Sequence, residues 1–303
     1  MPSPQVQTFL HPDTSTFSHV VWDSDSRRAA VIDSVLHYEA TSGRTSTHYA
    51  DQIIRFIREN GLETEWVLET HAHADHVTAG AYIKRTLGGA SGIGAGIRDV
   101  QKHFRDVYNL ERGFLPDGSQ FDHLFEDGEI FRVGNIEARA IATPGHTPDH
   151  LTYLIGDAAF VGDSLFMPDS GTARCDFPGG SAETLYRSIQ RLFELPEATR
   201  LFVLHDYGPG GRERLNETTV GAEKHDNIHV GGTRSEAEFI KLRTERDNTL
   251  GLPSLIIPAV QINIRAGELP PAEANEIRYL KIPLDRADAF STTADTDPCA
   301  RQK

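Results

Sequence analysis

The sequence predicts an α/β fold in which two mixed β-sheets lie between layers of helices. Short apolar runs come first, an amphipathic stretch follows them, and strand-like and helix-like segments then alternate along the chain. Polar residues gather where several of the apolar runs end. This order of elements is typical of layered α/β architectures, in which helices cover the faces of the sheets.

The N-terminal part predicts a hairpin, a helix and a buried strand. Residues 17–36 contain two apolar runs around the polar turn 23–26, which is the pattern of a β-hairpin. Residues 47–60 place apolar side chains at helical spacing and end at an Asn-Gly pair. Residues 65–70 then predict a short buried strand, and residues 77–89 a helix closed by glycines.

The middle of the chain predicts a meander and a further pair of strands. Alternating residues between 124 and 142, with Asp-Gly and Gly-Asn turns, indicate the meander. Residues 151–157 and 158–166 predict two strands that meet at a Gly-Asp turn. A helix over 181–195 begins at Ser181, a residue that favours helix N-termini.

The last third predicts a strand that begins at residue 200 and ends at His205, a polar helix over 235–248 and an apolar run over 252–267. No repeat and no Pro/Gly/Ser-rich linker divides the chain, so we expect residues 1–285 to form a single domain. Residues 286–303 are poor in apolar side chains, and we expect a flexible C-terminal tail there.

Composition excludes several classes of function. The net charge of -14 argues against a general affinity for nucleic acid or for an anionic membrane surface. The two cysteines, Cys175 and Cys299, do not form the pattern of a disulfide scaffold, which indicates a reducing compartment. Since no signal peptide and no membrane-spanning run is recognisable, we expect a cytoplasmic protein without nucleic-acid or membrane partners.

The stretch Glu69–His76, "ETHAHADH", is the strongest functional signal. It holds three histidines, His71, His73 and His76, together with Asp75, directly after a predicted strand. Imidazole and carboxylate are the usual ligands of zinc and of non-haem iron. The loops after later predicted strands supply further ligand types, namely His146, Asp163 and His205. The sequence therefore predicts one metal site built from several strand ends.

These motifs, His-x-His-x-Asp-His, Gly-His, Gly-Asp and a final His, resemble the metallo-β-lactamase superfamily over roughly residues 15–210. The resemblance implies an αβ/βα sandwich with metal at the loop edge of the two sheets. In hydrolases of this superfamily, such as glyoxalase II, the set would hold two metals. His71, His73 and His146 would bind one metal, Asp75, His76 and His205 the other, and Asp163 would bridge them.

The segment Thr172–Phe177, "TARCDF", resembles instead the Arg-x-Asp-Phe signature of the persulfide dioxygenase branch. This resemblance implies oxidation of glutathione persulfide, or a similar small persulfide, by O2 and water to sulfite and free thiol, a reaction of sulfide detoxification. A dinuclear glyoxalase II-like thioester hydrolase or lactonase is the alternative. A metal-binding member without catalytic activity is a third hypothesis, which the intact ligand set argues against.

The persulfide dioxygenase resemblance implies one Fe(II) per chain, bound by His71, His146 and Asp163. Two histidines and one carboxylate leave three positions open for substrate and O2. His73, Asp75, His76 and His205 would then orient the ligands through hydrogen bonds.

Three residues are candidates for substrate binding. Arg174 can grip a carboxylate of glutathione with its planar fork, and Asp176 is expected to pair near it. Tyr207 can donate a phenolic hydrogen bond, and Arg214 lies in the loop after His205. Cys175 is expected to be an inert buried thiol. A homodimer through the polar helical region after residue 233 is a further expectation.

Overall fold

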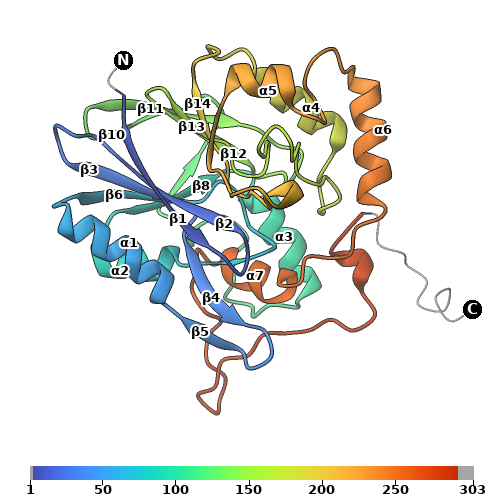
Figure 1. Cartoon of the computed structure of the whole chain (residues 1–303). Helices are drawn as coiled ribbons and strands as arrows, with labels where there is room; N and C mark the ends of the chain where they lie inside the picture. The colour runs from blue at the N-terminus through green and yellow to red at the C-terminus, as the bar shows by residue number, and fades with distance from the viewer. Residues whose placement is uncertain (1–2, 293–303) are drawn as a thin grey trace, which may run out of the picture.

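The computed structural model describes residues 3–292, whose two main β-sheets pack face to face (Figure 1). In the first sheet, the pairs at one side are antiparallel and the pairs from β3 onward are parallel. Its strands, in spatial order, are β1 (Gln5–His11), β2 (Thr16–Trp22), β3 (Arg28–Ile32), β6 (Glu63–Leu68), β8 (Ala90–Gly94) and β9 (His123–Phe125).

The second sheet is antiparallel except for the parallel pair β13 and β14. Its strands, again in spatial order, are β10 (Ile130–Val133), β11 (Ile136–Ala142), β12 (Leu151–Ile155), β13 (Ala158–Phe160), β14 (Arg200–Phe202) and β15 (Glu217–Thr219). A small third sheet is formed by β5 (Arg44–Ser46), β4 (Val35–Glu39) and β7 (Val77–Thr78). The predicted pair of mixed sheets is therefore confirmed.

Helices cover the outer faces of both main sheets, as predicted (Figure 1). The first sheet is covered by α1 (His48–Glu59) and α2 (Gly80–Leu87), and the second by α4 (Ala182–Leu192) and α6 (Glu236–Asp247). The remaining helices are α3 (Ile97–Val107), α5 (Val220–Asp226), α7 (Ile256–Asn263) and the 3-10 turns Pro209–Gly211 and Ala287–Ala289.

Alternation along the strands explains these layers. On β3, Ala30 and Ile32 point into the core between the sheets, whereas Ala29 and Val31 face α1 and α2. Because successive strand residues point to opposite faces, a continuous apolar run is buried on both sides. The predicted start of the helix over 181–195 is confirmed: Ser181 accepts a hydrogen bond from the backbone N–H of Thr184, which stabilises the first turn of α4. The helix predicted over 77–89 begins later, at Gly80, because Val77–Thr78 pair with β4 as strand β7.

The meander predicted over residues 124–142 is wrong in its pairing. β9 pairs with β8 in the first sheet, whereas β10 and β11 pair with each other in the second sheet. The chain thus changes sheet at the Asp127-Gly128 turn, and Phe125 and Phe131 meet in the core with ring centroids 4.8 Å apart. An alternating pattern shows which face is buried, but it does not show which sheet a strand joins. The elements β1, β4, β5, β7, β8, β15, α3 and α5 were not predicted.

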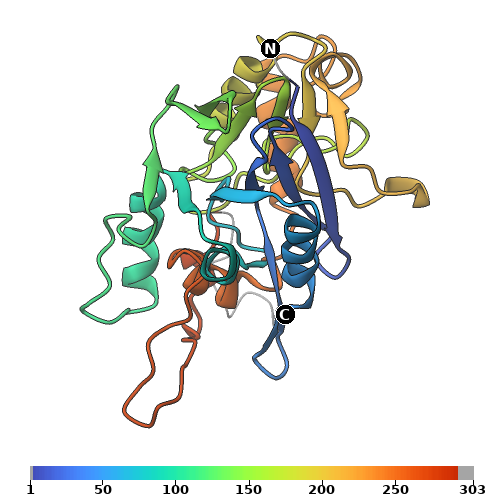
Figure 2. The same cartoon turned by 90° about the vertical axis from the view of Figure 1, so that its left-hand side faces the viewer.

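The C-terminal segment leaves α7 as a long loop that extends away from the two sheets (Figure 2) and then returns. The prediction of a flexible tail from residue 286 is wrong for residues 287–292, because Phe290 packs against Phe104 and Tyr108 of the α3 region. Residues 293–303 lie outside the described residues. Between residues 3 and 292, no helix has the length and apolar character needed to cross a membrane.

Candidate metal centre

Four loops, each following a strand of the two main sheets, bring the predicted metal-binding residues together. Residues 69–76 follow β6, His146 follows β11, Asp163 follows β13 and His205 lies beyond β14. One donor atom from each of His71, His146 and Asp163 lies within 4.8 Å of the other two. His71 and Asp163, which are 92 residues apart in the sequence (163 − 71), therefore lie in a single cluster, as expected from their positions at strand ends.

His71 presents one ring nitrogen to the cluster. The hydroxyl of Thr70 donates to Asp33 Oδ2 at 3.0 Å, so its oxygen accepts a hydrogen bond from Nδ1–H of His71, also at 3.0 Å. Nε2 of His71 then has the lone pair, lies 4.0 Å from Asp163 Oδ2 and has no hydrogen-bond partner. This tautomer is the one in which Nε2 can bind a metal.

His146 and Asp163 are oriented by hydrogen bonds in a similar way. Nδ1–H of His146 donates to the carbonyl oxygen of Arg174 at 2.7 Å, and Nε2 lies 3.5 Å from Asp163 Oδ2. The backbone N–H of Asp163 donates to Nε2 of His150 at 2.9 Å. His150 was not predicted, although it stands in the same Thr-Pro-Gly-His-Thr-Pro-Asp-His segment as His146.

His73 is held between two buried carboxylates. Its Nε2 lies 3.0 Å from Asp33 Oδ1 and 3.1 Å from Glu69 Oε2, while its Nδ1 has no partner. Burial lowers the pKa of His73, but Asp33 and Glu69 outweigh that effect and raise the pKa well above its usual range. Asp33 was not predicted as a site residue, because a lone aspartate after an apolar run also fits a turn.

His205 completes the cluster on its other side. Its Nδ1–H donates to the carbonyl oxygen of Ser15 at 3.2 Å, and its Nε2 lies 3.1 Å from Asp75 Oδ2 and 3.6 Å from Asp163 Oδ1. Burial lowers the pKa of His205, but the carboxylates of Asp75 and Asp163 raise it to about 9. His76 lies beside Asp75, with Nδ1 3.4 Å from Asp75 Oδ1.

The unpartnered atoms of this cluster fit bound metal. Buried polar atoms without hydrogen bonds are rare because each one costs free energy. Several occur here together, namely His71 Nε2, His73 Nδ1, both ring nitrogens of His76, Asp163 Oδ1 and His205 Nε2. A metal ion that accepts their lone pairs removes that cost, and imidazole with carboxylate suits zinc and iron.

The cluster opens into a cavity of about 660 Å³, which is lined by His76, His146, Asp163 and His205 among others. This volume lies within the range of about 300–1,000 Å³ that is usual for small-molecule sites. Tyr207 also lines the cavity, and its ring lies parallel to that of His205 at 6.0 Å. Arg214 is not among the lining residues, so the structure does not place this predicted substrate contact at the cavity.

Arg174 lines the cavity, but its guanidinium group is already paired. Nε and Nη2 bind the two carboxylate oxygens of Asp176 at 2.5 and 2.6 Å, and Nη1 donates to the carbonyl oxygen of Gly251 at 2.7 Å. The expected Arg174–Asp176 pair is therefore present, and it occupies the fork that we expected to bind a substrate carboxylate. Cys175 is buried, and burial raises the pKa of its thiol far above its usual range.

Helix α6 contributes to the site in a way that its polar sequence did not indicate. Arg243, which is 1% exposed, donates to Asp247 Oδ1 at 2.7 and 3.0 Å and to the carbonyl oxygen of Thr172 at 2.9 Å. Asp247 Oδ2 accepts the backbone N–H of Cys175 at 2.9 Å. Arg246 also lines the cavity, and among residues 3–292 its side chain has neither an ion pair nor a hydrogen bond.

Comparison with curated proteins finds relatives with two kinds of name. The chain is 49% identical over 283 residues to "Glyoxylase B2" of Dictyostelium discoideum, a match that covers 93% of this chain and 97% of that protein. It is 30% identical over 269 residues to the mitochondrial persulfide dioxygenase ETHE1 of Homo sapiens, covering 88% of this chain and 90% of that protein.

Comparison with solved structures gives the same architecture. The crystal structure of ETHE1 from Myxococcus xanthus matches with a TM-score of 0.70 and 29% identity, covering 87% of this chain and 100% of the other. The family model of the metallo-beta-lactamase superfamily matches residues 11–205, a span that begins at the end of β1 and ends at His205 of the cluster. This match, together with the two-sheet sandwich and the His/Asp cluster, shows that the chain belongs to the metallo-beta-lactamase superfamily.

Proposed function

We propose that this protein is a non-haem iron persulfide dioxygenase that oxidises glutathione persulfide or a similar small persulfide. The observation that carries the proposal is the convergence of His71, His146 and Asp163, two imidazoles and one carboxylate with their donor atoms within 4.8 Å. Such a set holds Fe(II) in a way that leaves coordination positions open. The similarity to the proteins named ETHE1 in human and in Myxococcus xanthus supports this reading.

The reaction consumes one persulfide, one O2 and one water, and it yields one thiol, one sulfite and two protons. A ferrous ion bound by the three residues would supply the redox chemistry that adds oxygen to the outer sulfur. The contribution of the chain is orientation: Thr70 and the Arg174 carbonyl oxygen fix the rings of His71 and His146. His205 and Asp75, 3.1 Å apart at the cavity wall, can hold and pass one of the released protons.

The cavity suits an anionic thiol compound. The positive charge of Arg174 is neutralised by Asp176, and that of Arg243 by Asp247. Arg246 remains as a lining arginine without an ion pair among the described residues, and we assign to it the binding of a substrate carboxylate. Tyr207 lines the cavity and is 60% exposed as a residue, and we assign to its hydroxyl a hydrogen bond with the peptide part of glutathione.

A dinuclear hydrolase is the second candidate, and two observations favour it. His73 Nδ1 and both ring nitrogens of His76 have no hydrogen-bond partner, as expected for ligands of additional metal. A relative with 49% identity has the name "Glyoxylase B2". On this reading, two ions would activate water for attack on a thioester.

Metal content and oxygen uptake on the same sample distinguish the two candidates. Protein purified without oxygen is analysed for metal and is then given glutathione persulfide or a glutathione thioester. The dioxygenase proposal requires about one iron per chain, O2 uptake and one sulfite per O2. About two metals per chain with thioester cleavage and no O2 uptake would establish the hydrolase instead. His225→Gln, on the exposed surface of α5, serves as the matched control.

A further inference from the structure

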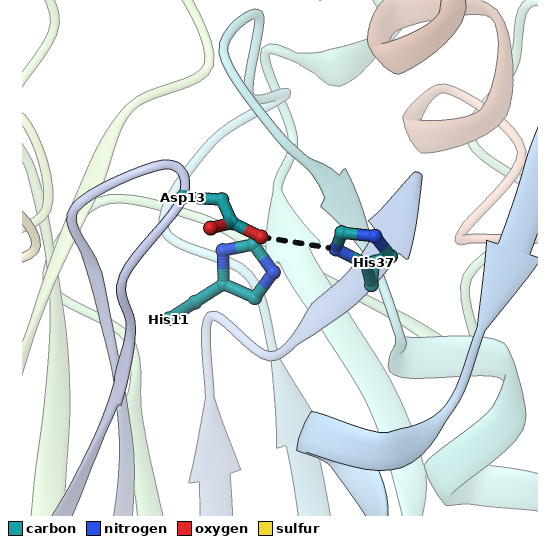
Figure 3. A group of neighbouring side chains, drawn as sticks. All are labelled: His11, Asp13 and His37. Atoms are coloured by element: carbon teal, nitrogen blue, oxygen red, sulfur yellow. Dashed lines mark ion pairs between the residues drawn. The ribbon is translucent and has the colours of Figure 1, made fainter. Parts of the chain in front are cut away.

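A second group of metal-ligand side chains lies in the wall of the same cavity. It consists of His11 at the end of β1, Asp13 in the following turn and His37 in β4. Figure 3 shows the three side chains pointing toward one another, and one donor atom from each lies within 4.8 Å of the other two. The group shares no residue with the His71, His146 and Asp163 cluster.

His11 has the features of a ligand rather than of a core histidine. Its side chain is 3% exposed, and its buried Nε2 has no hydrogen-bond partner. Its Nδ1 lies 2.8 Å from the hydroxyl of Thr14, which in turn lies 2.7 Å from the hydroxyl of Thr16. In one tautomer the backbone N–H of Thr14 donates to Nδ1 at 3.3 Å. Metal binding through Nε2 uses the other tautomer, in which Nδ1–H donates to the Thr14 hydroxyl at 2.8 Å and Nε2 has the lone pair.

The other two donors are already spaced for a small cation. Nδ1 of His37 lies 3.4 Å from Asp13 Oδ2, the contact that is dashed in Figure 3. Ligands about 2.0–2.1 Å from a tetrahedral zinc ion are roughly 3.3 Å apart, so this pair needs almost no movement. Like His11 Nε2, His37 Nδ1 is buried without a hydrogen bond.

We propose that His11, Asp13 and His37 form a second divalent-cation site, suited to Zn²⁺, in the cavity wall. Two imidazoles and one carboxylate are a zinc-type ligand set, and a set of three protein ligands leaves the fourth position to water or substrate. Because all three residues line the cavity, that position faces the chamber into which the His71, His146 and Asp163 cluster also opens. A bound cation would add positive charge there and would attract an anionic group of the substrate. The inference does not depend on the reaction performed at the first cluster.

Zinc binding to the metal-loaded full-length protein tests this site. Equilibrium dialysis against micromolar Zn²⁺ should show one zinc per chain in addition to the resident metal, and His37→Asn and Asp13→Asn should each weaken that binding at least tenfold. His48→Asn is the matched control, because His48 lies beside His37, with ring centroids 5.5 Å apart, but outside the group. Asp13 is 60% exposed in its turn, so its substitution tests the ligand without disturbing the core.

Two further measurements make the outcome decisive. Co²⁺ in place of zinc should give the visible absorption of a four-coordinate site in the wild type and should lose it in His37→Asn. Asp163→Ala, which removes a ligand of the first cluster only, should retain the additional zinc, so a failure of the dioxygenase proposal leaves this result unaffected. Equal zinc content in the wild type, His37→Asn and Asp13→Asn would overturn the proposal.

Discussion

Nδ1 of His146 donates to the carbonyl oxygen of Arg174 at 2.7 Å, and the side chain of Arg174 is itself bound to Asp176 at 2.5 and 2.6 Å. The segment that resembles a substrate-binding signature therefore supports a metal-binding histidine through its backbone. Its guanidinium–carboxylate pair fixes the loop, and the loop fixes the imidazole. Arg174 is thus a positioning residue.

Replacing Arg174 by Ala should reduce stability and kcat, with little change in KM for the persulfide. The variant removes the guanidinium group that pairs with the carboxylate of Asp176, which is 2% exposed. We expect the free energy of unfolding to fall by up to about 3 kcal/mol, which is the lower end of the range for a broken buried ion pair. The lower end applies because Ser291 also donates a hydrogen bond to Asp176. Chemical denaturation and steady-state kinetics measure both effects. A rise in KM alone would return Arg174 to the substrate site.

Replacing Arg246 by Ala should have the opposite kinetic signature. Arg246 lines the cavity without an ion-pair partner among residues 3–292, so its charge is available to a carboxylate of the substrate. We expect KM to rise about tenfold, equivalent to about 1.4 kcal/mol, while kcat changes little. Arg214→Ala is the control, because Arg214 does not line the cavity, and its kinetics should match the wild type. Equal effects of the two substitutions would exclude the specific role of Arg246.

The difference between Arg174 and Arg246 shows what the sequence could and could not predict. The ligand types were predictable because His71, His146, Asp163 and His205 were each expected at or just after the end of a strand, and strand ends converge at loops. The pairing of Arg174 was partly predictable, since Asp176 stands two residues away. The unpaired charge of Arg246 could not be predicted, because the sequence of a polar helix does not show which of its arginines is buried against a distant loop.

The same limit applies to the fold. Helix α1 was predictable because Ala50, Ile53, Ile54 and Ile57 form one buried stripe. The sheet to which β9 belongs could not be predicted, because a helix and a long loop separate β9 from its partner strand β8 in the sequence. The His11, Asp13 and His37 group was also missed, since His11 and Asp13 lie at the end of β1 and in the turn after it, whereas His37 lies in β4, and only the folded structure brings β4 beside that turn.

Asp163→Ala and His205→Ala should differ in iron content. Asp163 Oδ2 lies 3.5 Å from His146 Nε2 and 4.0 Å from His71 Nε2, close to both of the other proposed ligands, so its loss should remove both iron and activity. His205 pairs with Asp75 at 3.1 Å and should be dispensable for binding of a single ion. Metal analysis after anaerobic purification checks this expectation. Equal loss of metal from both variants would contradict the mononuclear assignment and favour the dinuclear hydrolase.

Because of the buried Glu223 carboxyl, the free energy of unfolding should fall as the pH rises from about 4.5 to about 8. The side chain is fully buried on α5, Oε2 accepts from Asn227 Nδ2 at 2.7 Å, and Oε1 has no hydrogen-bond partner. Burial raises the pKa of Glu223 from 4.5 to about 8, so the folded protein keeps a proton that the unfolded chain releases. Folding then takes up a proton in this range, and the free energy of unfolding falls by up to about 1.4 kcal/mol per pH unit from this group.

Glu223→Gln isolates this contribution, because the amide has nearly the same shape as the protonated carboxyl and can still accept from Asn227. Urea unfolding of both proteins at several pH values gives the difference in their free energies of unfolding. The variant should be close to the wild type near pH 4.5 and should become the more stable of the two as the pH approaches 8, because only the wild type loses proton-linked stability. Parallel pH profiles for the two proteins would mean that the carboxyl ionises in the folded state as it does in the unfolded chain, and that Asn227 together with local water satisfies the charge.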